Sequence, residues 1–182
     1  PPRSTLFPYT TLFRSICDVG TGSGIIAVCA AKYLPAARVT AIDSSPEGLV
    51  VARANAAEHG VAERIEFLEG DLLGPLAEGR QFDLVASNPP YVSEDEYEKL
   101  EHNVKKYEPK LALLAGVDGL DIYQRILEKV NDFLKPDGAL MMEIGYAQGP
   151  AIKRMLEETG IFKEIRIEKD FANNDRIAIA KK

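Results

Sequence analysis

The sequence of 182 residues has few of the thiol and imidazole side chains that bind transition metals, with only two cysteines and two histidines. Cys17 and Cys29 do not have the spacing of a zinc or dithiol motif, and free thiols of this kind suit a reducing cytoplasm. No apolar run reaches the length of a transmembrane helix. The sequence also lacks a basic excess. Its net charge of -6 disfavours a nonspecific nucleic-acid binder, which needs a basic surface.

The composition is that of an ordinary globular domain, with 46% hydrophobic and 27% charged residues. Residues 1–15 stand apart, because Thr5-Leu6-Phe7 recurs as Thr11-Leu12-Phe13 without helical or strand periodicity. This segment resembles translated adaptor sequence, and it has no layout of a signal peptide. We therefore expect residues 1–15 to be non-native and residues 16–182 to form one domain. A genuine but unusual N-terminal arm is the alternative.

The pattern of apolar residues predicts alternating strands and helices. Strands are expected at 16–19, 38–43, 65–69, 82–87, 139–144, 162–168 and 176–180. Helices are expected at 25–31, 46–59, 94–103, 118–134 and 148–159, with a turn at 135–138 and a loop or lid over 92–117. The last two strands lie close in sequence and read as an antiparallel hairpin. Strands that alternate with helices predict a three-layer α/β fold with a mostly parallel, seven-stranded sheet.

The tetrapeptide Asn88-Pro89-Pro90-Tyr91 follows the apolar run at 82–87. Neither proline can donate to a strand ladder, and each restricts the residue before it to an extended conformation. Asn88 and Pro89 should therefore hold their carbonyl oxygens in nearly fixed directions, at the strand end where open α/β sheets bind ligands. One amide, two fixed carbonyls and one aromatic ring suit a flat group that carries an NH2. A strand-terminating turn with a packed tyrosine is the alternative.

A glycine-rich turn follows the first predicted strand. Gly20, Gly22 and Gly24 are separated by Thr21 and Ser23, and the next residue is isoleucine. This spacing differs from the G-x-G-x-x-G fingerprint of dinucleotide-binding folds. It resembles the first motif of S-adenosylmethionine-dependent methyltransferases, whose loop closes on the methionine part of the cofactor. Tight packing of the turn is the alternative.

Acidic residues follow the next two predicted strands. Asp43 lies about 20 residues after the glycine turn, where a carboxylate can accept hydrogen bonds from both ribose hydroxyls. Asp71 could accept from an adenine amino group, with Leu72 against the ring. The alternative for either acid is a helix N-cap, although Ser45 can already fill that position beside Asp43. Asp18, just before the turn, could brace the loop or contact the cofactor indirectly.

These features together make the chain resemble class I methyltransferases of the release-factor glutamine N5 type. Further stretches that match this family lie at 107–109, 111–113, 116–120 and 143–145. The resemblance covers about residues 16–182. It implies a Rossmann-like methyltransferase fold and a cytoplasmic enzyme. We expect the helical N-terminal domain of that family, which helps to dock the protein substrate, to be missing.

The resemblance also implies a reaction: methyl transfer from S-adenosylmethionine to the side-chain amide nitrogen of a glutamine in a peptide-chain release factor, with S-adenosylhomocysteine as product. The catalytic residues would be Asn88, Pro89, Pro90 and Tyr91. The Asn88 side-chain oxygen and the Pro89 carbonyl would accept the two amide N–H bonds, and Tyr91 would pack against the amide plane. Catalysis would then be mainly positioning by oriented acceptors, with no metal. The cofactor would be held by Gly20, Thr21, Gly22, Ser23, Gly24, Asp43, Asp71, Leu72 and Asn88.

Two other functions are compatible with these residues. An N6-adenine methyltransferase acting on DNA or RNA uses the same kind of tetrapeptide, because the adenine amine is also a flat NH2, although base flipping would be needed in a duplex. The acidic charge and the absence of a target-recognition insert argue against it. The other alternative is a non-catalytic scaffold that binds S-adenosylmethionine, against which the intact Asn88 argues. The sequence leaves the oligomeric state open.

Overall fold

The computed structural model describes residues 13–100 and 109–182. Seven strands form one sheet in the order β3-β2-β1-β4-β5-β7-β6. The strands are β1 Ser15–Val19, β2 Arg38–Asp43, β3 Ile65–Glu69, β4 Phe82–Ser87, β5 Leu134–Glu143, β6 Glu164–Lys169 and β7 Asp175–Lys181. The helices of the described ranges are α1 Ile25–Tyr33, α2 Pro46–Glu58, α3 Glu94–Lys99, α5 Asp121–Phe133 and α6 Gly149–Glu158, with short 3-10 turns at Ala62–Arg64 and Lys110–Ala112.

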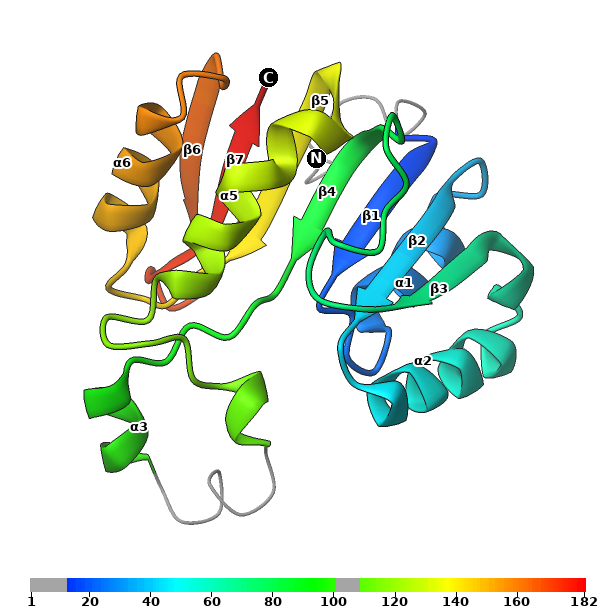
Figure 1. Cartoon of the computed structure of the whole chain (residues 1–182), viewed down its shortest axis with the longest axis horizontal. Coiled ribbons are helices and arrows are strands. Elements are labelled where there is room, and N and C mark those ends of the chain that lie inside the picture. Colours follow the sequence, from blue (N-terminus) through cyan, green and yellow to red (C-terminus); the bar gives the residue numbers. More distant parts are fainter. Residues whose placement is uncertain (1–12, 101–108) are drawn as a thin grey trace.

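Strands β1 to β5 pair in parallel, and β7 pairs antiparallel with both β5 and β6. The predicted mostly parallel, seven-stranded sheet with a C-terminal hairpin is therefore confirmed. In Figure 1, α5 crosses one face of the sheet, α1 lies behind it, and the segments that leave β3 and β4 run from the lower edge. That lower edge is the carboxyl end of the parallel strands, where such sheets bind ligands.

Alternation along β1 explains the two cores. Successive side chains of a strand point to opposite faces, so Ile16 packs with α1 while Cys17 and Val19 pack on the face of α5 and α6. The α1 face is built from small residues such as Ala27 and Ala41, which let the helix lie close to the sheet. The α5 face uses larger side chains, which the amphipathic pattern of that helix supplies.

The structure corrects several predicted boundaries. The turn expected at 135–138 lies inside β5, where the pairing shifts from Phe82 with Leu134 to Leu84 with Ala139, so the extra residues form a bulge in the strand. Helix α5 begins at Asp121 rather than at 118, because Gly119 has a positive φ of 76° and Leu120 donates to the Asp118 side chain.

The connection from β3 to β4, residues 70–81, contains no helix, unlike the other links between parallel strands in the described part of the chain. It crosses the sheet in front of β1 and β4 in Figure 1 and buries Leu73 and Leu76 in the α5 face. An extended segment thus covers the sheet where a layer of helix was expected.

The segment expected as an irregular lid is partly ordered by hydrogen bonds. Helix α3 has a capping box between Ser93 and Glu96 and ends at Lys99, so it is shorter than predicted; residues 101–103 lie outside the described residues. Val92 forms a parallel bridge with Leu114, through Val92 N–H to the Leu113 carbonyl and Ala115 N–H to the Val92 carbonyl. The chain after Tyr91 is therefore tied to the loop before α5.

The fold begins before residue 16. Ser15 is the first residue of β1, and Phe13 packs against the α1 core. The backbone N–H groups of Arg14 and Ser15 both donate to Asp83 on β4. The segment predicted to be non-native was 1–15; its residues 13–15 pack with the domain, and residues 1–12 lie outside the described residues. Within the described ranges, no helix has both the length and the apolar character needed to cross a membrane.

Candidate active site

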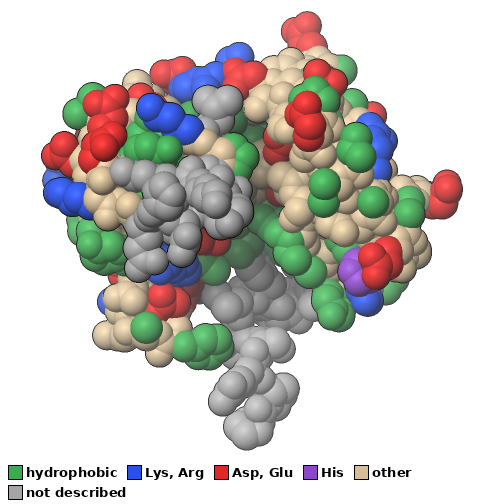
Figure 2. Space-filling model, turned by 90° about the horizontal axis from the view of Figure 1, so that it is seen from below, with side chains coloured by type: hydrophobic (Ala, Val, Ile, Leu, Met, Phe, Trp, Pro, Cys, Tyr) green, Lys and Arg blue, Asp and Glu red, His purple; other side chains and the backbone are tan. Residues whose placement is uncertain are grey.

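Strand register brings the predicted site residues to one place. Val19 of β1 pairs with Ser87 of β4 on one side and with Ile42 of β2 on the other. The next residues along these strands are Gly20, Asn88 and Asp43, so the glycine turn starts between the asparagine and the acid. Adjacent strands lie about 4.8 Å apart. Three elements that were separate in the sequence therefore share the carboxyl edge, which Figure 2 views from below.

The glycine turn is exposed at its tip and packed at its end. Gly20, Gly22 and Gly24 all have positive φ, at 69°, 53° and 83°. A Cβ on Gly20 or Gly22 would meet no atom within 4 Å, whereas one on Gly24 would lie 2.9 Å from the Ala52 side chain. Two of the glycines thus leave open space above the backbone, and the third allows α1 to pack against α2.

Asp18 braces the turn from within. Its Oδ2 accepts the Thr21 hydroxyl at 2.5 Å and the Ala27 N–H, in the first turn of α1, at 3.0 Å. Asp18 is fully buried, and its Oδ1 has no hydrogen-bond partner. Burial raises its pKa to about 6, with a smaller upward contribution from the charge of Asp43 and opposition from the two hydrogen bonds. Asp18 thus has the bracing contacts that the sequence suggested.

Asp43 holds the other side of the turn. Its Oδ2 accepts the Gly22 N–H at 2.7 Å, and its Oδ1 accepts the Ser45 N–H at 2.8 Å. Ser45 caps α2 by accepting the Gly48 N–H, as predicted, and Pro46 is the first helical residue. A carboxylate has about four lone-pair positions, so each oxygen of Asp43 retains capacity for one more donor.

Asp71 follows β3 and contacts α5. Its carboxylate is ion-paired with Arg125, and both side chains are largely exposed. Leu72 has a positive φ of 49°, which is unfavourable for a residue with a branched side chain. A cavity of about 250 Å³ opens between this loop and α5, and Asp71, Leu72, Arg125 and Glu128 are among its lining residues. The loop is thus held in a conformation that its sequence alone disfavours.

The tetrapeptide leaves β4 in an orientation that suits a ligand site. Asn88 is exposed, so its side chain is not turned into the core, while Pro89 is buried. The Ser87 hydroxyl donates to the Val19 carbonyl at 2.7 Å and fixes the strand end next to the glycine turn. Tyr91 is half-buried and packs against the α5 core.

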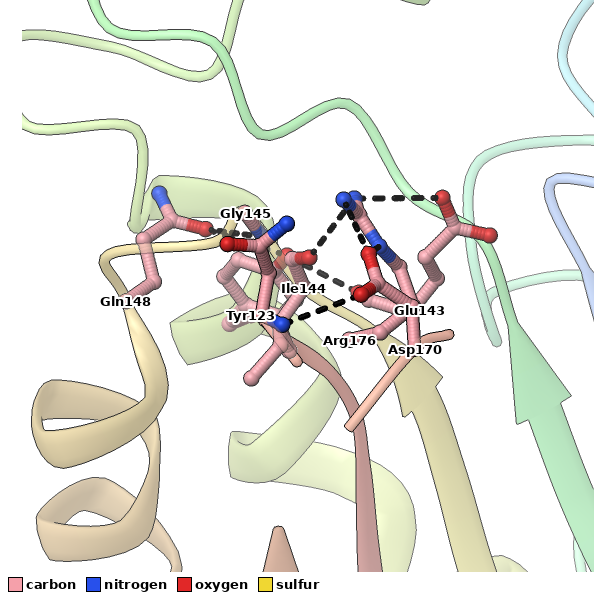
Figure 3. Close-up of polar contacts among 8 residues, drawn as sticks. Tyr123, Glu143, Ile144, Gly145, Gln148, Asp170 and Arg176 are labelled. Carbon is pink, nitrogen blue, oxygen red and sulfur yellow. Dashed lines mark hydrogen bonds and ion pairs between the residues drawn. The ribbon is translucent and has the colours of Figure 1, made fainter. Parts of the chain in front are cut away.

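Two charged residues, Glu143 and Arg176, lie close to the Tyr91 phenol. Burial, and next the negative charge of Glu143, raise the pKa of the Tyr91 phenol, which also lies close to Arg176. In Figure 3, Arg176 extends from β7 between Glu143 and Asp170. Its guanidinium donates to Asp170 at 3.2 Å and to the Ile144 carbonyl at 3.4 Å. The hairpin and the end of β5 therefore fix the environment of Tyr91.

A family model described as a methyltransferase domain matches residues 14–174. The chain belongs to this methyltransferase domain family. Among solved structures, a ribosomal protein L11 methylase from Lactobacillus delbrueckii subsp. bulgaricus is 26% identical, with a TM-score of 0.67 over 99% of this chain and 73% of that one. A methyltransferase from Pyrococcus furiosus, at 20% identity and a TM-score of 0.68 over 93% of this chain and 74% of its own, supports the fold alone.

Curated relatives are more similar in sequence. A release factor glutamine methyltransferase from Clostridium acetobutylicum is 42% identical over 169 residues, which cover 92% of this chain and 59% of the relative. One from Enterococcus faecalis is 45% identical over 166 residues, or 91% of this chain and 59% of the relative. The methyltransferase domain described here thus spans a little under three fifths of the length of these relatives.

The residues at the edge fit the cofactor that a methyltransferase domain implies. The open space above Gly20 and Gly22 admits a ligand close to the backbone. Asp43 has acceptor capacity left for hydroxyl donors, as a ribose requires. Thr21 is buried, its hydroxyl donates to Asp18 and its N–H donates to the Ile42 carbonyl, so both of its hydrogen-bond donors are already used. Ser23 is exposed at the tip of the turn.

Sequence reasoning did not single out the residues that support the tetrapeptide. Glu143 was noted only as part of a family-like stretch, Gln148 only as a helix start, and Arg176 only as a strand residue. Gln148 follows Gly145 and precedes Gly149, and a polar residue between glycines at the carboxyl end of a strand was the available signal. Residues 107 and 108 of another family-like stretch lie outside the described residues.

Proposed function

We propose that this chain transfers a methyl group from S-adenosylmethionine to the side-chain amide nitrogen of a glutamine in a peptide-chain release factor. The main support for the proposal is the pairing of Val19 on β1 with Ser87 on β4, because this register places the first residue of the glycine turn beside Asn88. The names of the curated relatives support the choice of substrate. Release factors act in translation, so the proposed substrate places the activity in the cytoplasm.

When bound, S-adenosylmethionine supplies an electrophilic methyl group on a sulfonium. The amide nitrogen of glutamine is a poor nucleophile, because its lone pair is delocalised into the carbonyl. In the transfer a nitrogen–carbon bond forms and the sulfur–carbon bond breaks, sulfur keeps the electron pair, and the nitrogen releases one proton to water. The protein's task is then to orient the amide rather than to activate a leaving group.

Asn88 and Pro89 would carry out that orientation. The Asn88 side-chain oxygen and the Pro89 carbonyl accept the two N–H bonds of the substrate amide in this proposal. Fixed acceptors of this kind draw charge toward the nitrogen and aim its lone pair at the methyl group. Pro90 keeps the Pro89 carbonyl direction fixed, since a residue before proline is restricted to extended conformations. The Tyr91 ring packs on the amide plane.

The cofactor half of the proposal uses the other strand ends. The backbone of residues 20–24 would lie against the methionine part, and Asp43 would accept from the ribose hydroxyls. Asp71 and Leu72 would bind the adenine, although Asp71 now pairs with Arg125 and would share its carboxylate with that guanidinium. The acidic charge of the chain weighs against a nucleic-acid substrate.

Labelled methyl transfer tests the proposal. The protein is incubated with methyl-labelled S-adenosylmethionine and either a glutamine-containing release factor peptide or an adenine-containing oligonucleotide, while cofactor binding is measured separately by calorimetry. We expect label in the peptide alone. Label in the oligonucleotide would replace the proposed substrate by adenine, and cofactor binding without transfer to either acceptor would indicate a non-catalytic scaffold.

A further inference from the structure

The side chain of Gln148 joins three segments of the chain at the carboxyl edge. Its Nε2 donates to the Tyr91 carbonyl at 3.0 Å and to the Gly119 carbonyl at 3.2 Å. Its Oε1 accepts the Gly145 N–H at 2.9 Å. Figure 3 shows this side chain at the start of α6, turned toward Gly145 at the end of β5. The exits of β4 and β5 and the loop before α5 are thus held by one amide.

These contacts need an amide in particular. Glutamine offers two N–H donors and an acceptor oxygen in one plane, which matches two carbonyls and one N–H. Glutamate would keep the acceptor and lose both donors, and methionine would lose all three. The Tyr123 hydroxyl, which donates to the Glu143 carbonyl at 2.9 Å, also lies 3.4 Å from Oε1.

The surroundings leave little space for another arrangement. A Cβ on Gly119 would lie 2.8 Å from the Gln148 Nε2 and 2.4 Å from the Tyr91 carbonyl oxygen. A Cβ on Gly145 would lie 2.9 Å from the Gln148 Oε1. The amide therefore fits between two glycines, and the carbonyl of Tyr91 is confined from two sides.

Holding the Tyr91 carbonyl also holds Asn88. The tetrapeptide is fixed at its beginning by β4, where the Ser87 hydroxyl donates to Val19, and at its end by Gln148 on the Tyr91 carbonyl and by the Val92 N–H, which donates to the Leu113 carbonyl. Between these points the prolines fix two φ angles and restrict the residue before each of them. Few soft dihedrals remain, so an anchor at Tyr91 limits the directions available to the Asn88 side chain.

We propose that Gln148 is a positioning residue for methyl transfer. It fixes the Tyr91 carbonyl and, through the two prolines, the orientation of the acceptor oxygens of Asn88 and Pro89. It need not touch either the cofactor or the acceptor amide. The proposal rests on the proposed function for the identity of the acceptor, but it applies to any flat NH2 group that the tetrapeptide orients.

Two substitutions test this role on whichever acceptor the wild-type chain methylates. Gln148→Glu places a carboxylate opposite two carbonyl oxygens. We expect kcat to fall about 10- to 100-fold at pH 8, because a displacement of about 1 Å can reduce a rate by about 10²-fold. The KM for the cofactor should stay within about twofold. Two carbonyl oxygens beside the new carboxyl disfavour its charged form and raise its pKa, so at pH 6 a larger fraction can donate to one carbonyl, and the variant should partly recover relative to wild type. Gln148→Met should lose activity at both pH values.

Gln81→Glu is the matched control, since Gln81 is exposed before β4 at the opposite edge and the charge change is the same. We expect it to behave as wild type at both pH values. A wild-type kcat in Gln148→Glu, or a fall in kcat accompanied by an equally large rise in the KM for the cofactor, would overturn the role of Gln148. If Gln148→Met does not fold, the kcat of Gln148→Glu relative to wild type, together with its KM for the cofactor, still tests the role. Transfer to adenine instead of glutamine would refute the proposed substrate. The comparison of the Gln148 variants with wild type on adenine would still test the role of Gln148.

Discussion

The two halves of the candidate site are held in different ways. The cofactor half, around the glycine turn, is braced by Asp18 and Asp43 through hydrogen bonds between residues no more than 21 positions apart. The substrate half, residues 88–91, is anchored at Tyr91 by Gln148, from 57 positions away. One half is thus organised by neighbouring segments, and the other depends on the assembled sheet.

This difference has a consequence for function. The glycine turn and Asp43 need only β1, β2 and the helices that follow them, whereas the adenine side adds Asp71 and Leu72 after β3, with Asp71 paired to Arg125 of α5. The substrate half takes its shape from the ends of β4, β5 and β7 together, so a change in any of these elements can alter the acceptor geometry. Substitutions in the two halves should therefore affect cofactor binding and methyl transfer separately.

The largest effect is expected in the substrate half. Asn88→Ala removes an oriented acceptor and should lower the rate of transfer by about 10²- to 10³-fold, as the loss of one oriented hydrogen-bonding group does in other enzymes. Cofactor affinity, measured by calorimetry, should be nearly unchanged. Asn131→Ala, at an exposed position of α5, is the control. Unchanged turnover in Asn88→Ala rules out the role given to this residue.

The role of Asp18 in the cofactor half can be tested by the pH dependence of the unfolding free energy. Its pKa is about 6 in the folded protein and about 3.8 in the unfolded chain, so the stabilisation from its protonated form is complete below pH 3.8 and is lost as the pH rises through 6. The unfolding free energy of wild type minus that of Asp18→Asn should decrease over this range, by no more than about 3 kcal/mol. Chemical denaturation at several pH values measures it. A difference that increases with pH would contradict the account.

Asp43→Ala should weaken the cofactor half directly. Loss of a hydrogen bond to a charged group reduces affinity by about 1–3 kcal/mol, and the Gly22 N–H loses its partner as well. Glu69→Ala, the exposed residue that pairs with Asp43 on β3, is the matched control. Calorimetry that shows equal affinity in both variants would remove Asp43 from the ribose site.

The smallest effect is expected from Arg125→Ala. Its ion pair with Asp71 is exposed, so the unfolding free energy should change by less than about 1 kcal/mol. Cofactor affinity should not decrease, because the substitution frees the Asp71 carboxylate. A weaker cofactor complex would instead show that Arg125 holds Asp71 in its binding position.

The difference between local contacts and contacts between distant segments also explains which features the sequence could predict. The strand ends at Asp43 and Ser87, the cap at Ser45 and the terminal hairpin follow from local patterns, and the structure confirms them. The bulge in β5 and the helix-free link at 70–81 depend on pairing and packing with distant residues. Asp71 was predicted from its place after β3, but its pairing with Arg125 could not be, because the two lie 54 positions apart.

The support of the tetrapeptide was the least predictable part. Nothing in the spacing of Gln148 or Arg176 connects them to Tyr91, and only the order of β4, β5 and β7 in the sheet brings them together. Local sequence thus predicts which residues could contact the substrate, whereas the residues that hold them in place can be identified only from the sheet topology.

A crystal structure of the protein with S-adenosylhomocysteine and a glutamine peptide would test the central geometry most directly. We expect the glutamine amide nitrogen to lie within hydrogen-bond distance of both the Asn88 side-chain oxygen and the Pro89 carbonyl oxygen. The cofactor sulfur should lie on the side of the glycine turn. A cofactor bound away from residues 20–24, or an amide that contacts neither oxygen, would contradict it.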